Sequence, residues 1–302
     1  MKSRHYSRRT ILTGLGLATV GGVVGVKTMK PFKTASEELL QMPDTERMPA
    51  LFVGHGSPMN AIVPNAWNKA WREIGASIPK PKAILSVSAH WLTGNGMLVT
   101  ASEKPQMNYD MGGFPRELYE LQYPAPGNPA LAAEIESALQ MRIPTHGDTS
   151  WGFDHGTWLV LKHMFPKADI PVIQLSMDYS KPPAFHYELA KLLQPLRNKG
   201  VLILGSGNIV HNLRELVRTD DTPFDWAEEF DSRMVSYIKD DNHQAVVDFR
   251  NLGSLASMAH PTHDHFLPLL FTLGLQSSGE EVRSFTEGFQ YKSTSMRSFQ
   301  IG

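Results

Sequence analysis

The stretches VLILGSGNIVHNL (201–213) and KAILSVSAHW (82–91) decide the fold class. In each, an apolar run ends in small residues and then reaches a histidine, His211 in the first and His90 in the second. The run ALFVGHG (50–56) ends in the same way at His55. Short apolar runs with glycine or other small residues at their ends indicate buried strands. The sequence therefore predicts strands whose carboxyl ends each deliver a histidine.

Helical patterns separate these runs. Apolar positions at helical spacing predict helices over NPALAAEIESALQM (128–141), DHGTWLVLKHMF (154–165) and PPAFHYELAKLLQPLRNKG (182–200). The continuous apolar run IPVIQLSM (170–177) is typical of a strand that is buried on both faces. Because strands and helices alternate, we predict a single α/β domain with a central, mixed and mostly parallel sheet flanked by helices.

Composition narrows the classes of function. The 302 residues are 41% hydrophobic and 20% charged, with a formal net charge of −1 and no long basic block. Nucleic acid is therefore not an expected partner, because phosphate binding requires clustered positive charge. The sequence contains no cysteine. Disulfides and thiolate chemistry are excluded, and any metal must be held by histidine and carboxylate side chains.

The histidines at the strand ends predict a metal site. In open α/β sheets, ligands bind beyond the carboxyl ends of the strands. His55, His90 and His211 should meet at this edge, and AHPTHDHFLPLL (259–270) adds His260, His263 and His265. Imidazole ligands without thiols suit zinc or Fe(II). The residues alone leave open which histidines bind the metal and which carry protons.

Six motifs, in this order, resemble those of a known family. They are LFVGHGSPMNA (51–61), LSVSAHW (85–91), YDMGGFPRELYELQYPAPGNP (109–129), WGFDHGTW (151–158), LGSGNIVHNL (204–213) and HPTHDHFLPLL (260–270). Together they resemble the DOPA-dioxygenase group of the class III extradiol ring-cleavage dioxygenases, the catalytic-subunit-B type. The resemblance covers residues 48–302, which we expect to form the catalytic domain.

The resemblance implies roles for five histidines. His55 and His90 match metal ligands of the family, and His265 is the expected third ligand. His211 matches the histidine regarded as acid or base, and it is also a candidate fourth ligand. His155 matches a further catalytic position, where it would serve as acid or position oxygen. The implied cofactor is Fe(II), with zinc able to occupy the site in a purified sample.

Other residues of the motifs are expected nearby. His260 is a candidate for supporting a ligand or contacting substrate, and Asp264 for orienting a ligand imidazole. Tyr109 and Phe114 are candidates for an aromatic wall around a planar ring. We expect His263 to be a bystander, because its position varies within the motif.

The activity that the resemblance implies is the opening of a catecholic ring with O2, and a DOPA-like compound is a candidate substrate. Two alternatives remain open from the residues. One is a zinc-dependent hydrolase in which His211 or Asp264 is the base for a metal-bound water. The other is a periplasmic protein that binds a metal or a phenol without catalysis.

The N-terminus has the features of an export signal. Arg8 and Arg9 precede an uncharged run from Thr10 to Val26. This pattern over residues 1–30 resembles a twin-arginine signal, which exports folded proteins. We therefore expect the twin-arginine export machinery as a partner and the periplasm as the location, with a membrane tether if the signal is not cleaved. Residues 31–47 have the polar character of a linker.

Overall fold

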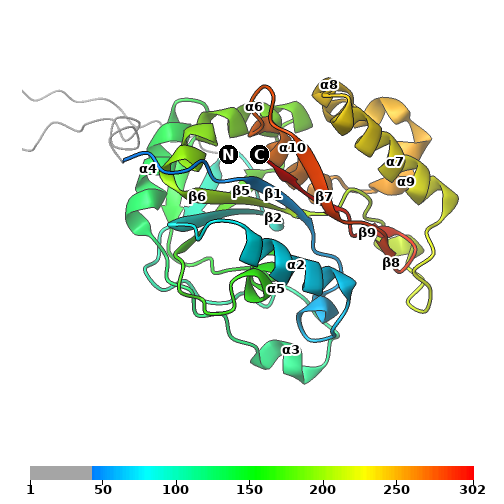
Figure 1. Ribbon diagram of the computed structural model, residues 1–302, viewed down its shortest axis with the longest axis horizontal. Helices are drawn as coiled ribbons and strands as arrows, with labels where there is room; N and C mark the ends of the chain where they lie inside the picture. Colours follow the sequence, from blue (N-terminus) through cyan, green and yellow to red (C-terminus); the bar gives the residue numbers. More distant parts are fainter. Residues whose placement is uncertain (1–42) are drawn as a thin grey trace, which may run out of the picture. The chain divides into compact units, whose positions relative to one another are not determined.

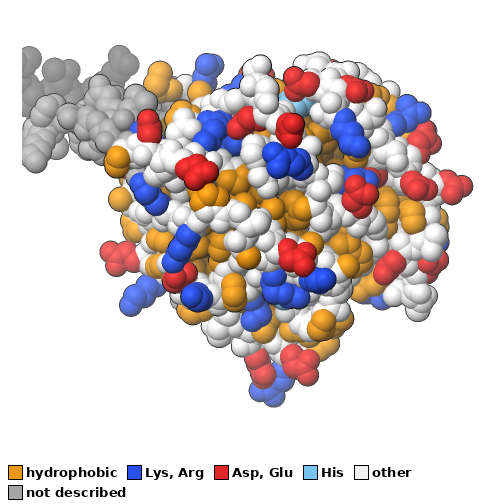
Figure 2. All heavy atoms as spheres, viewed as in Figure 1, with side chains coloured by type: hydrophobic (Ala, Val, Ile, Leu, Met, Phe, Trp, Pro, Cys, Tyr) orange, Lys and Arg blue, Asp and Glu red, His pale blue; other side chains and the backbone are white. Residues whose placement is uncertain are grey.

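The computed structural model describes residues 43–302. The predicted signal over residues 1–30 and the predicted linker up to residue 42 lie outside the described residues. The described part confirms the predicted α/β class, with a mixed sheet between layers of helices (Figure 1). Within residues 43–302, no helix combines the length and the apolar character needed to cross a membrane. Figure 2 shows acidic and basic side chains interspersed over the visible face.

The sheet has eight strands in the order β4-β3-β5-β2-β6-β1-β10-β7. Its centre is parallel and consists of β5 (Val172–Asp178), β2 (Ala83–Thr93), β6 (Val201–Gly207) and β1 (Ala50–Gly54). On one side β3 (Met97–Thr100) runs antiparallel to β5 and carries β4 (Thr145–Asp148) at the edge. On the other side β10 (Ser298–Ile301) and β7 (Val282–Thr286) continue the sheet in antiparallel pairing.

Helices cover both faces of the sheet (Figure 1). One face packs against α2 (Ala66–Ser77) and α5 (His155–Met164). The other packs against α4 (Pro129–Gln140), α6 (Pro183–Ala190) and α10 (Leu267–Gly274). The helices α7 (Asp225–Lys239), α8 (His243–Val247) and α9 (Ser254–Ala259) group together next to the hairpin of β8 (Phe289–Gln290) and β9 (Thr294–Ser295). The short helix α3 (Arg116–Glu120) lies in the loop after β3.

The apolar strands are buried on both faces because their side chains alternate between two cores. In β6, Leu202 and Leu204 enter the core beneath α2 and α5, while Val201 and Ile203 enter the core beneath α6 and α10. Full burial of such a side chain contributes ~1.5–3 kcal/mol. This explains why the strands appear in the sequence as continuous apolar runs.

The helix predicted over 182–200 is divided in the structure. It forms α6 up to Ala190 and then a 3-10 helix, η2 (Lys191–Lys199), which contains Pro195. Proline lacks the N–H group that an α-helix needs, and its ring clashes with the carbonyl four residues earlier. The single α-helix of the prediction is therefore wrong at this point. Gly200 ends the segment with a φ of 83°, which glycine adopts without penalty.

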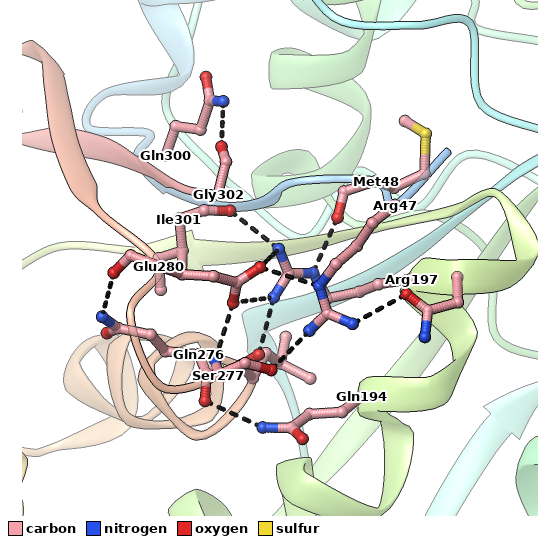
Figure 3. A network of polar contacts seen from close by, with 12 residues as sticks. Arg47, Met48, Gln194, Arg197, Gln276, Ser277, Glu280, Gln300, Ile301 and Gly302 are labelled. Carbon is pink, nitrogen blue, oxygen red and sulfur yellow. Dashed lines mark hydrogen bonds and ion pairs between the residues drawn. The ribbon is translucent and has the colours of Figure 1, made fainter. Parts of the chain in front are cut away.

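A buried arginine ties η2 to both ends of the described chain (Figure 3). Arg197 donates to the carbonyl oxygens of Met48 at 2.8 Å, Leu275 at 2.8 Å and Ile301 at 3.1 Å. It also forms an ion pair with Glu280 at 2.7 Å. The network holds the start of β1 and the end of β10 together. These strands lie next to each other in the order β6-β1-β10, and the network is at the edge of the sheet away from the histidines.

Candidate active site

Five histidines line one cavity of about 280 Å³ at the carboxyl edge of the parallel strands. They are His55 directly after β1, His90 near the end of β2, His155 at the start of α5, His211 beyond β6 and His265 in the 3-10 helix η5 (Asp264–Phe266). The structure thus brings together residues separated by more than two hundred positions. The shared direction of β1, β2 and β6 is the reason, because their ends open on the same side of the sheet.

Three of these rings are arranged to hold one metal ion. The ligand atoms of His55, His90 and His265 all lie within 4.8 Å of one another. The Nε2 atoms of His55 and His90 are 3.1 Å apart. Two nitrogens that each lie about 2.0–2.1 Å from a tetrahedral ion are roughly 3.3 Å apart, so the spacing fits a shared metal.

A serine fixes the orientation of His55. The Ser206 hydroxyl donates to the Gly156 carbonyl at 2.6 Å. Its oxygen therefore accepts from Nδ1 of His55, which lies 3.0 Å away. With the proton on Nδ1, the lone pair of Nε2 is left for a metal. Gly156 lies close to this serine and to Ser88 on the adjacent strand. A Cβ at position 156 would lie only 2.5 Å from the Ser88 hydroxyl oxygen, so glycine is needed where α5 meets these strands.

Carboxylates orient the other two rings. Asp264 Oδ2 lies 3.0 Å from Nδ1 of His265, and Asp110 Oδ2 lies 3.3 Å from Nδ1 of His90. Asp264 accepts the Nδ1 proton of His265, and Asp110 lies on the Nδ1 side of His90, so that Nε2 of each ring is directed outward, an arrangement common among metal-binding histidines. Burial raises the pKa of Asp264, but the hydrogen bonds from His265 and Thr262, together with the charge interactions with His265 and His211, outweigh burial and hold that pKa below its usual range.

Burial keeps three of the imidazoles neutral. Loss of hydration lowers the pKa of His55, His90 and His211 well below the ordinary value, and neighbouring histidines reinforce the effect. Neutral imidazole is the form that binds metals. The donor set, its protonation and its spacing therefore fit a first-row metal such as iron or zinc.

Asp110 is the residue that the sequence analysis missed. Its Oδ1 accepts the backbone N–H of His155 at 2.8 Å, and its Oδ2 lies 3.0 Å from Nδ1 of His155. It also forms a second close group with His90 and His155. The signal in the sequence is a carboxylate within YDMGG (109–113), between the aromatic candidates Tyr109 and Phe114. Because the backbone and imidazole N–H groups of His155 already occupy this carboxylate, we interpret the group as hydrogen-bonded support for the site.

His211 stands against the third candidate ligand. Its ring stacks on His265 with centroids 3.5 Å apart and an interplanar angle of 9°. Its backbone N–H donates to Ala259 at 3.0 Å, which anchors the loop after β6. The ring lines the cavity, so it is placed to exchange a proton with a bound molecule.

Of the two aromatic candidates, only one lines the cavity. Phe114 lines the cavity together with Met111. Tyr109 is not among the lining residues: its hydroxyl donates to Leu121 at 2.6 Å and its ring packs near Trp158. Tyr109 therefore holds the loop, and the aromatic wall is formed by Phe114 without it.

His260 and His263 also lie apart from the cavity. His260 is buried among phenylalanine rings, and its Nε2 donates to Ile209 at 2.6 Å. It supports the loop after β6 from behind, and the structure gives no support for a contact with substrate. The ring of His263 stacks on Tyr179, and its Nδ1 accepts from Arg250 at 2.9 Å, so this side chain does not line the cavity.

Comparison with known proteins agrees with this geometry. Residues 49–301 match a family described as the catalytic LigB subunit of aromatic ring-opening dioxygenase. The chain is 44% identical over 265 residues to a 4,5-DOPA dioxygenase extradiol of Escherichia coli (strain K12), covering 85% of this chain and 95% of the relative. A protein of the same description from Beta vulgaris is 37% identical over 239 residues, covering 77% and 88%.

A solved structure shares the fold. The crystal structure of an uncharacterized protein from Escherichia coli K12 superposes with a TM-score of 0.74 at 41% sequence identity. The match covers 85% of this chain and all of that protein.

Proposed function

Because the chain belongs to the family of catalytic LigB subunits of aromatic ring-opening dioxygenases and is an extradiol dioxygenase, we propose that it uses Fe(II) to open a catechol with a DOPA-like side chain. The observation that carries the proposal is the convergence of His55, His90 and His265, with an oxygen atom of Ser206, Asp110 or Asp264 beside each Nδ1. Membership of this family favours the oxygenase over the zinc hydrolase and the non-catalytic binding protein.

In this proposal the three Nε2 atoms hold the metal. When bound, Fe(II) supplies the redox-active Lewis acid through which electron density of the catechol reaches O2. Ser206, Asp264 and Asp110 keep the three rings in the orientation that binding requires. Zinc suits the same nitrogens, so a purified sample that contains zinc is compatible with the oxygenase activity.

Two further histidines move protons. His211 is neutral because burial lowers its pKa, so its ring is able to accept a proton from a catechol hydroxyl. His155 presents Nε2 while Asp110 holds its Nδ1, and the carboxylate stabilises the ring when it is protonated. We assign His211 the role of base and His155 that of acid or oxygen-positioning group. Phe114 and Met111 line the cavity and exclude water from one side of the bound catechol ring.

Reconstitution tests the function directly. The protein is loaded with Fe(II) under anaerobic conditions and then exposed to air with a panel of catechols. We expect a yellow, ring-opened product with the iron form and none with the apoprotein. Absence of ring opening across the panel, with ester hydrolysis by the zinc form, would favour the hydrolase. Tight binding of metal and phenol without turnover would favour the binding protein.

The location is a separate proposal. We propose that the chain is exported in folded form, on the strength of Arg8, Arg9 and the uncharged run that follows them. Fractionation of cells expressing the full chain should place the protein in the periplasm or on the periplasmic side of the membrane. The double substitution Arg8→Lys with Arg9→Lys should retain it in the cytoplasm.

A further inference from the structure

The opening of the cavity carries one cationic side chain besides its histidines. Leu213 and Leu216 form an apolar border there, and Arg218 follows them in the loop that leads to α7. Among the described residues that line the cavity, Asp110 is the only carboxylate. Since Asp110 is already engaged by the imidazole and backbone N–H of His155 and lies 3.3 Å from Nδ1 of His90, the cavity offers a cation to a ligand but no available anion.

No acidic neighbour neutralises the charge of Arg218, because Asp220 and Asp221 interact with other groups. Asp220 forms an ion pair with Lys292 at 2.8 Å, and Asp221 accepts the backbone N–H of Tyr291 at 2.8 Å. Within residues 43–302, the Arg218 side chain makes no hydrogen bond or ion pair. Its guanidinium lies over the ring of Tyr291, 5.8 Å from the centroid. A cation–π contact of this kind leaves the N–H groups of the guanidinium free to bind a carboxylate.

The backbone around Tyr291 is held in an unfavourable conformation. Tyr291 has a φ of 57° and Lys292 a φ of 67°, values that residues with a Cβ rarely adopt. Both lie in the turn between β8 and β9, and the Val217 N–H donates to the Tyr291 carbonyl at 3.2 Å. The turn thereby places the aromatic ring beside Arg218 at the cavity. Strain of this kind is concentrated at binding sites, which agrees with a role for the pair.

We propose that Arg218, supported by Tyr291, forms an anion subsite that recognises a carboxylate on the side chain of the catechol. The inference rests on the proposed function, and it adds that an amino group on that side chain is not required, because no free carboxylate faces it. The substrate class is therefore a catecholic carboxylic acid. The catechol oxygens point to the histidines while the carboxylate meets Arg218 at the opening.

The wild-type protein provides the first test. The Fe(II) form is assayed with 3-(3,4-dihydroxyphenyl)propionate, its neutral methyl ester and 3,4-dihydroxyphenethylamine. We expect kcat/KM for the acid to exceed the values for the ester and the amine by about tenfold or more, mainly through KM. Equal values for the three compounds would overturn the subsite. Failure with all three while another catechol of the panel is opened would also overturn the subsite, whereas failure with the whole panel would overturn the proposed function, so the two failures are distinguishable.

Variants then assign the preference to a residue. Arg218→Gln should reduce the ratio of acid to ester by about tenfold, and Arg218→Glu should make the amine a better substrate than the acid. Inversion is informative because a misfolded variant does not gain a preference. Arg214→Gln is the matched control: Arg214 is exposed in the same loop but does not line the cavity, so the ratio should stay at the wild-type value. An unchanged ratio in both Arg218 variants would contradict the proposal.

Discussion

A single carboxylate oxygen of Asp110 lies close to both His155 and His90. Its Oδ2 lies 3.0 Å from Nδ1 of His155 and 3.3 Å from Nδ1 of His90, and the two rings are 3.9 Å apart. A candidate metal ligand and a candidate acid are thereby oriented by the same group. Displacement of the loop that carries Asp110 would affect metal binding and proton transfer together.

Asp110→Asn should weaken both properties. An amide has one oxygen and cannot accept both the imidazole and the backbone N–H of His155 on separate oxygens as the carboxylate does, and it carries no charge to stabilise a protonated His155. We expect Fe(II) affinity to fall by about 10- to 100-fold, with a lower kcat at saturating metal. Anaerobic Fe(II) titration and turnover measure the two effects. Glu103→Gln, an exposed carboxylate of the same loop, is the control, and equal behaviour of the two variants would refute the role.

Two histidines of a single motif should behave in opposite ways. His265→Ala should lose the metal, since Asp264 directs its ring toward His55 and His90. His263→Ala should retain it, because that ring contacts Tyr179 and Arg250 instead. Metal content after dialysis distinguishes them. Full retention by His265→Ala would exclude it as the third ligand, whereas His55→Ala and His90→Ala should each lose the metal.

His211→Ala should separate binding from turnover. The ring is stacked on His265 and is assigned to proton transfer, so its removal should leave most of the metal in place. Loss of a general base lowers rates by about 10²- to 10⁴-fold. Metal content and single-turnover ring opening are the two measurements. Loss of the metal in this variant would instead identify His211 as a fourth ligand.

The sequence predicted the parts of the site that depend on strand direction. His55, His90 and His211 follow apolar runs, and parallel strands bring such ends together whatever the loops do. Asp110 lies within a quoted motif, but its contacts with the histidines could not be predicted because they depend on how a long loop packs. That packing relies on contacts such as the hydrogen bond from Trp158 Nε1 to the Asn108 carbonyl.

The cluster at 260–265 divides in the structure. His260 lies close in sequence to His265, yet its ring packs against Phe230 and Phe249 from a different part of the chain. Its Nε2 donates to Ile209 behind the cavity, so proximity along the chain does not by itself bring a histidine to the cavity. The helix predicted over 182–200 failed for a local reason, Pro195, that the sequence itself displayed.

The ion pair of Arg197 with Glu280 should control stability in acid. Burial by itself raises the pKa of Glu280, but hydrogen bonds from Arg197, Ser277 and Arg47 lower it to about 2 from 4.5. A carboxylate with a depressed pKa stabilises the fold fully above its unfolded pKa, and this contribution disappears as the pH falls from about 4.5 to about 2. Glu280→Gln should therefore lower the Tm at pH 7 and flatten its dependence on pH in that window.

The cost of that substitution should be large, about 3 kcal/mol, because it leaves the buried guanidinium of Arg197 without its counter-charge. Glu281→Gln is the matched control: this neighbouring side chain is exposed and pairs only with Arg283 at 3.2 Å, so its loss should cost under about 1 kcal/mol. Thermal unfolding at pH 7, 4.5 and 3 gives the comparison. A Glu280→Gln protein whose Tm follows that of Glu281→Gln at all three values would show that the network in Figure 3 contributes nothing to stability.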